Sequence, residues 1–412
     1  MADGQMDSQK NDQVKSDNVR PARVAIARCP GYQAEDVKAA VRMAVDDLGG
    51  IGKFVSRGEK ILLKPNMLSP KPPEEAVTTH PEIVRAMIHL VREAGGTPLV
   101  GDTPGGRATE RILKNLAEST GIRKVCDEEG VEFVLLIDAE KFPVSNGKVA
   151  KSFELASTLR SVDGVISLAK MKTHTFTGLT GAVKNLYGLI PGLRKAGYHM
   201  RMQNANAFSE MLVDLAECVR PRLTVMDGIV GMDGDGPAAG RPIKIGLIIA
   251  SDNVHALDAV FAELVGAEFD CVQTIAIAQR RGLLPRSPPH ADVSGGGLDE
   301  FRIKDFKMPG SPKPFARIPA AIIRVASEGA SRKPVFSKSR CDLCGTCIES
   351  CPARALRRGE RIPAIDRGKC IRCYCCQELC PNKAIALKRL PARSLGRAAW
   401  SRTKRTLGRR RV

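Results

Sequence analysis

The cysteines of this chain are concentrated near its C-terminal end. Of thirteen cysteines in 412 residues, nine lie between Cys341 and Cys380. Thiolates bind metals strongly, and short spacers between them, with no secretion signal at the N-terminus, indicate a metal site rather than disulfides. Eight of the nine form two runs with the same spacing, C-x2-C-x2-C-x3-C-P: Cys341, Cys344, Cys347 and Cys351, then Cys370, Cys373, Cys376 and Cys380.

This spacing matches that of bacterial ferredoxins, in which such a run binds a [4Fe-4S] cluster. Three thiolates in a tight turn can reach three corners of a cube, and the fourth ligand then comes from the other run. Zinc knuckles use paired C-x2-C units instead. We therefore expect two [4Fe-4S] clusters, one bound by Cys341, Cys344, Cys347 and Cys380, the other by Cys370, Cys373, Cys376 and Cys351.

A second candidate site lies in the stretch 170–192, which is rich in lysine, threonine and glycine and follows a predicted strand. Parallel sheets bind ligands beyond the carboxyl ends of their strands, and so many donors favour a carboxylate or phosphate ligand. Acid-base or covalent chemistry would fall to Lys184 or His174. A structural glycine-rich loop with solvated lysines is the alternative. Four residues near other predicted strand ends are expected to face this site: Lys64, Asn66, His80 and Asp102.

The elements that position these residues are predicted from hydrophobic periodicity and from glycine and proline boundaries. Continuous aliphatic strands alternate with helices, which is typical of a mostly parallel sheet with helices on both faces. We therefore predict an α/β domain followed by a small α+β ferredoxin-like module. The expected strands are 22–29, 59–66, 97–102, 131–137, 163–169, 222–229 and 243–251, and the expected helices are 34–50, 81–96, 208–219 and 254–266.

Chain length and composition divide the sequence into five parts. Residues 1–20 are polar and predicted to be disordered, and residues 21–307 form the α/β domain. A segment rich in proline, serine and basic residues, 308–338, is predicted to be a linker. The cluster module is expected at 339–387, and a basic tail at 388–412.

The formal net charge is +19, and the tail supplies much of the excess. The tail is either a solvated end or a docking segment for an acidic redox partner, anionic lipid or RNA. Aromatic residues make up 4% of the chain, which argues against base stacking and nucleic-acid binding. No apolar run is long enough to span a membrane, and no apolar leader is found at the N-terminus, so a cytoplasmic location is expected.

Several longer stretches carry a family resemblance, from about residue 23 to 266. The chain resembles the domain of unknown function 362 family, which is often fused to ferredoxin modules. That resemblance implies no settled reaction. The stretches are LLKPNM, TTHPE, GDTPGG, AKMKTHTFTGLTGAVKNLYGLIPG, DGIVGMDGDGPAAGRP and DNVHALDAVFAELVG.

A more distant similarity links HTFTGLTGAVKNLYGLIPG to the nickel-pincer lactate racemases. It implies that Lys184 matches the lysine that tethers the cofactor, and that His174 matches the histidine of that stretch. It further implies His199 as a metal ligand and His80 as a proton shuttle. The residue before Lys184 is Val183, where those enzymes have arginine.

Three functions remain open from the sequence. The first is an iron-sulfur electron-transfer protein or oxidoreductase, in which two clusters exchange electrons with an anionic small molecule held by the α/β domain. A redox partner protein would then be required. The second is an isomerase-like or ligand-binding domain docked to a redox complex through its ferredoxin module. The third is an RNA-associated protein, against which the low aromatic content counts.

Overall fold

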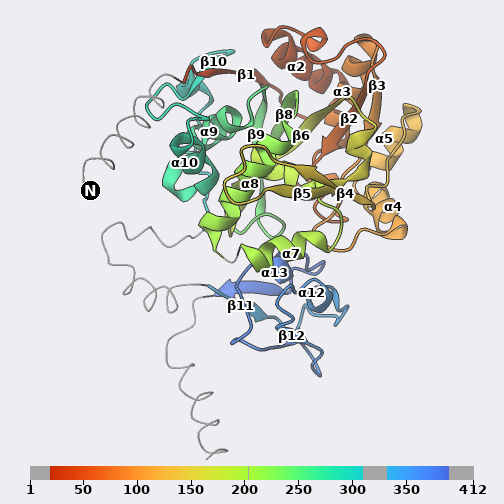
Figure 1. Ribbon diagram of the computed structural model, residues 1–412, viewed down its shortest axis with the longest axis vertical. Helices are drawn as coiled ribbons and strands as arrows, with labels where there is room; N and C mark the ends of the chain where they lie inside the picture. Colours follow the sequence, from red (N-terminus) through yellow and green to blue (C-terminus); the bar gives the residue numbers. More distant parts are fainter. Residues whose placement is uncertain (1–18, 203, 310–331, 389–412) are drawn as a thin grey trace, which may run out of the picture.

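The computed structural model describes residues 19–202, 204–309 and 332–388, which form an α/β domain with a smaller module docked at one end (Figure 1). The predicted disordered start, most of the predicted linker and nearly all of the basic tail lie outside the described residues. In the described part of the chain, every helix is too short or too polar to cross a lipid bilayer.

An eight-stranded sheet forms the centre of the large domain. The strands β1, β10, β8, β6, β2 and β3 share one direction, whereas β9 and the short β7 run antiparallel to their neighbours. The prediction of a mostly parallel sheet is confirmed. The order across the sheet is β10 (Ala291–Ser294), β1 (Ala22–Arg28), β9 (Arg241–Ser251), β8 (Leu223–Asp233), β6 (Gly164–His174), β2 (Lys60–Pro65) and β3 (Thr97–Val100), with β7 (Gly178–Thr180) added to β6.

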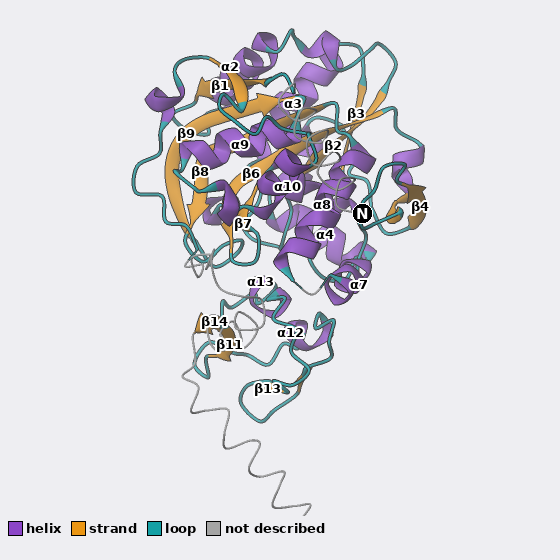
Figure 2. Cartoon of the chain, turned by 60° about the vertical axis from the view of Figure 1, so that its left-hand side comes forward, coloured by secondary structure: helices purple, strands orange, loops and turns teal. Residues whose placement is uncertain are grey.

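Two separate hydrophobic cores cover the two faces of this sheet. Successive side chains of a strand point to opposite faces, and in β2 Leu62 joins one core while Ile61 and Leu63 join the other. Both faces are therefore apolar and both need helices, as predicted. One layer contains α2 (Ala34–Asp47), α3 (Pro81–Glu93), α4 (Glu110–Ser119) and α5 (Ile122–Glu128); the other contains α8 (Ala205–Val219), α9 (Val254–Leu264) and α10 (Gln273–Arg280) (Figures 1 and 2).

The remaining elements of the domain are short. A small hairpin pairs β4 (Ala139–Pro143) with β5 (Ser152–Ala156). Two short helices, α6 (Ala182–Asn185) and α7 (Arg194–Arg201), follow β7. The single helical turns are η1 (Ile51–Lys53), η2 (Pro73–Glu75), η3 (Ser157–Arg160), η4 (Leu186–Leu189), η5 (Phe269–Cys271) and η6 (Leu298–Phe301).

The strand predicted at 131–137 is wrong. This segment makes one isolated parallel bridge, from Phe133 to Val100. Its two flanking backbone hydrogen bonds also go to Val100, the last residue of β3. Because β3 is only four residues long and ends at Val100, no strand ladder continues beyond this bridge. Other backbone amides of the segment bond within the chain nearby, Val131 to Cys126 O and Ile137 to Leu135 O.

The small module is built from an internal repeat offset by 29 residues, so that α12 (Thr346–Glu349) corresponds to α13 (Cys375–Glu378). Its left-handed residues also repeat: Leu343 and Arg372 both have φ 57°. The module begins earlier than predicted, because β11 (Lys333–Phe336) lies in the expected linker and pairs with β14 (Ile385–Lys388). A second short ladder joins β12 (Leu356–Arg357) to β13 (Ala364–Ile365).

Candidate functional site

The eight predicted cluster ligands line two small cavities in the module, each of about 20 Å³. This grouping is the one that the cysteine spacing led us to expect, with one ligand in each cavity contributed by the other run. The first cavity is lined by Cys341, Cys344, Cys347 and Cys380, and the second by Cys351, Cys370, Cys373 and Cys376.

The backbone around the cysteines fits a [4Fe-4S] group. The amide of Ala355 donates to Cys351 Sγ and the amide of Ala384 donates to Cys380 Sγ, both at 3.2 Å. Such N–H donors stabilise the negative charge on ligating sulfurs and tune the potential of a bound cluster. They occupy the same place in the two halves of the repeat, so both cavities offer the same chemistry.

A third cavity, of about 60 Å³, lies between the α/β domain and the module. Asn66, Asp102 and Lys184 are among the residues that line it, as predicted for the carboxyl edge of the sheet. The module closes it with Ser350 and with α13, which Figures 1 and 2 both place against the large domain. We call this cavity the interdomain pocket; its walls also include Lys172, Thr180, Asn185, Tyr187, Gly188, Lys195, His199, Cys375, Glu378 and Leu379.

Beneath the pocket is a buried ion pair between Lys64 at the end of β2 and Asp102 after β3. Lys64 Nζ lies 2.7 Å from Asp102 Oδ1, and the other carboxylate oxygen accepts the Met67 amide at 2.7 Å. Burial lowers the pKa of Lys64, and the charge of Asp102 opposes that shift. Gly188 is required here, because a Cβ would lie 2.0 Å from Asp102 Oδ1. The pair therefore holds together the backbone at the end of β2, after β3 and at Gly188.

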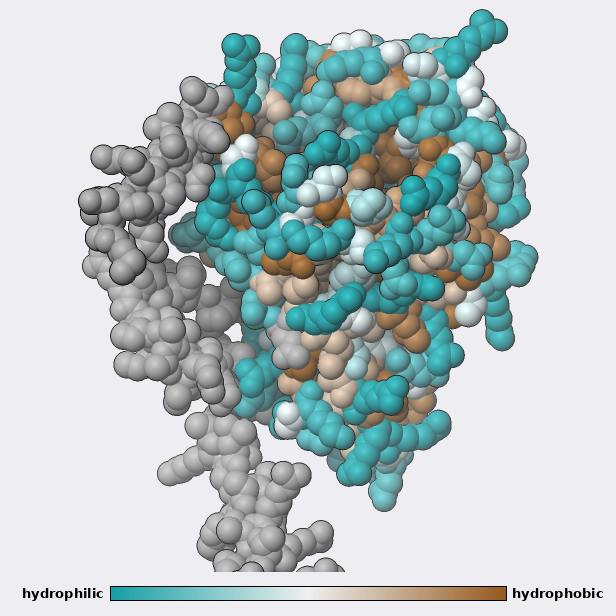
Figure 3. Space-filling model, viewed as in Figure 1, coloured by the Kyte–Doolittle hydropathy of each residue, from teal (hydrophilic) through white to brown (hydrophobic). Residues whose placement is uncertain are grey.

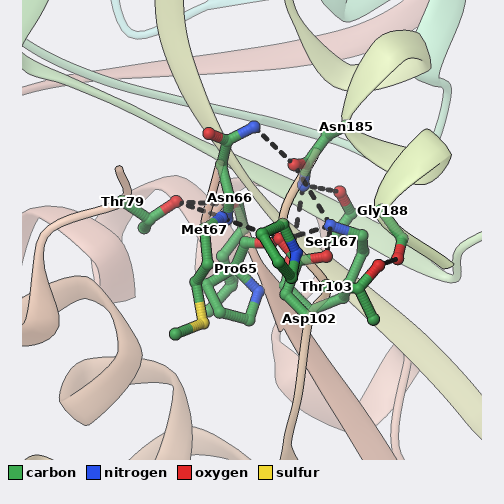
Figure 4. A network of polar contacts seen from close by, with 12 residues as sticks. Pro65, Asn66, Met67, Thr79, Asp102, Thr103, Ser167, Asn185 and Gly188 are labelled. Atoms are coloured by element: carbon green, nitrogen blue, oxygen red, sulfur yellow. Dashed lines mark hydrogen bonds and ion pairs between the residues drawn. The ribbon is translucent and has the colours of Figure 1, made fainter. Parts of the chain in front are cut away.

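Two asparagines and Lys172 form the polar wall of the pocket. Figure 4 shows the two asparagines, Asn66 and Asn185, side by side. Lys172 Nζ donates to Asn66 Oδ1 at 2.8 Å, and Asn66 Nδ2 donates to Asn185 Oδ1 at 3.0 Å. Asn185 in turn donates to Ser167 Oγ at 2.9 Å. Burial lowers the pKa of Lys172 well below its usual value, and the charge of Lys184 adds to the effect. Each amide is thus held in one orientation.

Lys184 is the cation that the pocket leaves available. It lies on α6, whose Ala182 and Val183 amides donate to the Asp258 carboxylate at 2.6 and 3.1 Å. In the described residues, Lys184 has no hydrogen bond and no ion pair, and its Nζ lies 5.8 Å from the centre of the Tyr187 ring. Burial lowers its pKa, partly offset by the charge of Glu378. Such an ammonium group can bind an anion or give up a proton.

His174 of β6 and Glu378 of α13 meet across the domain boundary. His174 Nδ1 accepts the Phe176 amide at 3.1 Å, which assigns the proton to Nε2, 3.1 Å from Glu378 Oε1. Burial lowers the pKa of His174 to about 4. Burial would raise the pKa of Glu378, but the charges of His174 and Lys184 bring it to about 2. Near neutral pH a neutral imidazole therefore faces a carboxylate.

His199 of α7 also lines the pocket, but it is held by packing. Its ring stacks on Phe208 with centroids 4.3 Å apart and planes inclined by 13°. Its Nδ1 has no hydrogen-bond partner among the described residues. Burial lowers its pKa to about 3. The neutral ring can thus accept a hydrogen bond from a ligand.

The expectation for His80 is wrong: it does not line the pocket. Its Nδ1 accepts the Glu82 amide at 3.2 Å as the cap of α3, and its ring stacks on Tyr32 at 3.6 Å. Its own amide donates to Asp227, which also pairs with Lys170 at 2.7 Å. Because these polar groups satisfy one another, His80 belongs to a structural network beside β8.

Two charged pocket residues were not found from the sequence, Lys195 and Glu378. Lys195 Nζ donates to Thr103 O at 2.9 Å and Pro104 O at 2.6 Å, which ties α7 to the 103–106 loop. Burial lowers its pKa to about 7. No pattern in the sequence marks Glu378 as a pocket residue. The first repeat also has a glutamate at the equivalent position, Glu349, and that glutamate is exposed.

A cysteine-rich repeat with two four-cysteine cavities, docked on an α/β sheet, defines an iron-sulfur protein. Residues 331–384 match the family described as a 4Fe-4S dicluster domain, and residues 61–263 match the domain of unknown function DUF362. The chain is 36% identical over 300 residues to a thylakoid-associated protein of Synechocystis sp., covering 69% of this chain and 89% of that protein. The chain therefore belongs to the DUF362 family.

Two solved structures are distantly similar. The lactate racemase apoprotein of Thermoanaerobacterium thermosaccharolyticum has 13% identity and a TM-score of 0.38, over 59% of this chain and 58% of that one. A protein of Thermotoga maritima has 13% identity and a TM-score of 0.33, over 57% and 60%. The chain thus spans less than two thirds of either structure. Similarity at this level says nothing about shared chemistry.

Proposed function

We propose that this protein is an iron-sulfur oxidoreductase with two [4Fe-4S] clusters and a small anionic substrate in the interdomain pocket. One observation carries the proposal. Helix α13 is shared between the two sites: Cys375 and Glu378 line the pocket, and Cys376 lines the second cysteine cavity. A ligand in the pocket would lie against the wall of that cavity. Bound [4Fe-4S] clusters supply single-electron transfer.

The pocket residues would bind and orient the anion. Lys184 supplies a positive charge and has no hydrogen bond or ion pair in the described chain. The fixed amide of Asn66, whose Nδ2 makes one hydrogen bond to Asn185 Oδ1, supplies a directed N–H donor. Docking of the module excludes water, which strengthens these interactions. The pocket is too small for a nucleotide, so the substrate is a small carboxylate or a similar anion.

Proton transfer would fall to Lys184. Its pKa is lowered by burial, so it exchanges a proton more readily than a solvated lysine does. The Glu378 carboxylate partly compensates the positive charge of Lys184, and the neutral His174 ring directs its Nε2–H at that carboxylate. His174 therefore orients Glu378 instead of contacting the substrate.

The test is native mass spectrometry and iron analysis of anaerobically purified protein. We expect a small anion to co-purify with the wild type and with the control Lys114→Ala, an exposed lysine paired with Glu110. Lys184→Ala should lose the anion and keep its iron, because the module supplies its own ligands. Retention of the anion by Lys184→Ala would contradict the proposal.

A second measurement separates the oxidoreductase from the isomerase-like alternative. The identified anion is added to protein that has been reduced with dithionite and freed of excess reductant, and the cluster signal is followed by electron paramagnetic resonance. An oxidoreductase that reduces the anion loses the reduced signal as product appears. Product formed with the signal unchanged would favour the isomerase-like domain.

A further inference from the structure

The described surface of the module carries an excess of positive charge. Nine of its lysines and arginines are exposed, against four exposed acids, and none of the nine forms an ion pair within residues 332–388 or with the described part of the large domain. One of the acids, Glu349, already faces Arg107 of the large domain. Hydrophilic side chains cover much of this end of the molecule in Figure 3. The nine are Lys338, Arg340, Arg354, Arg357, Arg358, Arg361, Arg367, Lys369 and Lys388.

Part of this charge borders a surface groove of about 560 Å³. All the residues that line the groove belong to the module, and none of them lines the interdomain pocket. Its floor is apolar, with Phe336 and Ile362 among prolines and aliphatic residues. Its three cations are Lys338, Arg361 and Arg367, beside a single acid, Glu360.

The groove shares its walls with both cysteine cavities. Phe336 and Pro363 also line the first cavity. Pro334 and Ile365 also line the second. A molecule seated in the groove would therefore be separated from each set of cysteines by a single layer of side chains.

We infer that this groove is the docking site of a small acidic electron-carrier protein. An apolar centre with a charged rim is the usual anatomy of a protein interface, and opposite charge speeds the encounter. A concave groove fits a protruding side chain of a protein better than it fits the flat surface of a bilayer. The inference rests on the proposed electron-transfer role. The exchange makes no bond: the carrier loses one electron and the module gains it, or the reverse.

The test uses oxidised flavodoxin, an acidic flavin protein, and the full chain purified anaerobically. Binding is measured by titration calorimetry at low and high salt. Arg361→Glu combined with Arg367→Glu should weaken binding by about tenfold at low salt, and the difference should shrink as salt screens the charges. Carbodiimide treatment of the wild-type complex should also link a flavodoxin carboxylate to Lys338.

The matched control is Arg57→Glu combined with Lys60→Glu, the same change of charge at the amino end of β2 on the large domain. This control should change flavodoxin binding by less than about twofold, because salt screens charges that lie far from the groove. Equal weakening by both variants would mean that net charge alone attracts the carrier, and it would overturn the inference. Unchanged binding in the groove variant would overturn it as well.

Two further arms identify the occupant and separate this inference from the proposed function. Phosphatidylglycerol vesicles are tested with the wild type and with the groove variant. If the vesicles bind the wild type but not the groove variant, while both proteins bind flavodoxin equally, the groove is a lipid site and the inference fails. Lys184→Ala should bind flavodoxin as the wild type does. Loss of the pocket anion in that variant with normal flavodoxin binding would therefore concern the pocket alone.

Discussion

The two sites of this protein are built in different ways. In the module, the ligands of each cysteine cavity come from two runs within 40 residues of chain, and the backbone between them repeats. In the interdomain pocket, the polar residues extend from Asn66 to His199, and Glu378 comes from the other domain. A site encoded by spacing should tolerate changes elsewhere in the fold, whereas a site made by convergence depends on every element that meets there.

The two glutamates of the repeat show the same contrast within one module. Glu349 and Glu378 occupy equivalent places, at the ends of α12 and α13. Glu349 is exposed and lies 3.6 Å from Arg107, while Glu378 is buried against His174. Docking on the large domain therefore gives one copy a role that the other lacks.

The largest expected effect comes from Cys347→Ala, which removes one ligand of the first cavity. Iron should fall from about eight to about four atoms per chain, because the second cavity keeps its own four cysteines. Iron analysis and electron paramagnetic resonance would check this. Loss of both cluster signals from a protein that remains folded by circular dichroism would contradict the ligand grouping.

Asp102→Ala should be the most destabilising change in the large domain. It leaves Lys64 buried without its partner, and breaking such a pair costs about 3–5 kcal/mol. Asp127→Ala is the control, because its pair with Arg123 is exposed and should contribute less than about 1 kcal/mol. Anaerobic urea unfolding measures both. A similar loss in the two variants would show that the buried pair has no special role.

The paired variants Glu378→Gln and Glu349→Gln test the contrast between the two repeats. Glu378→Gln should lower the free energy of unfolding by about 2 kcal/mol, because a neutral amide interacts less strongly than the buried carboxylate with the His174 N–H and with the charge of Lys184. Glu349→Gln, on the surface, should change it by less than about 0.5 kcal/mol. Equal effects would mean that docking does not distinguish the two positions.

The buried histidines predict a pH dependence. Burial holds the pKa of His199 at about 3, below its ordinary value of 6.5, so the unfolded state binds more protons as the pH falls below 6.5. Stability is therefore full above that pH and is lost as the pH drops. His199→Phe should reduce the loss between pH 8 and pH 5.5 by about 1 kcal/mol. Urea unfolding at the two pH values checks this, and an unchanged loss would contradict it.

The smallest effect on the two sites is expected from deleting residues 389–412. Iron content should stay at the wild-type value, since none of the eight cysteines lies in the tail. Binding of an acidic carrier should weaken at low salt only, because exposed charges are screened over about 10 Å at 0.1 M salt. Unchanged binding at low salt would remove the tail from any docking role.

The sequence alone determined what depends on short-range spacing or on a repeating pattern. Two cysteine runs specify their cavities because a tight turn brings its thiols together whatever surrounds it. Aliphatic strands alternating with helices specify a mostly parallel sheet, since both faces must be covered. Asn66, Asp102 and Lys184 could be placed at one edge because the carboxyl ends of parallel strands meet there.

The tertiary structure decided what depends on which surfaces touch. His80 also follows a strand end, but stacking on Tyr32 and the contact with Asp227 turn it into a structural residue. The segment 131–137 has the pattern of a strand, yet β3 ends at Val100 and shares only one bridge with it. In sequence, Glu378 is equivalent to the exposed Glu349, and only docking of the module on the large domain buries it. Burial and charge partners are properties of contacts distant in sequence, and no local pattern encodes them.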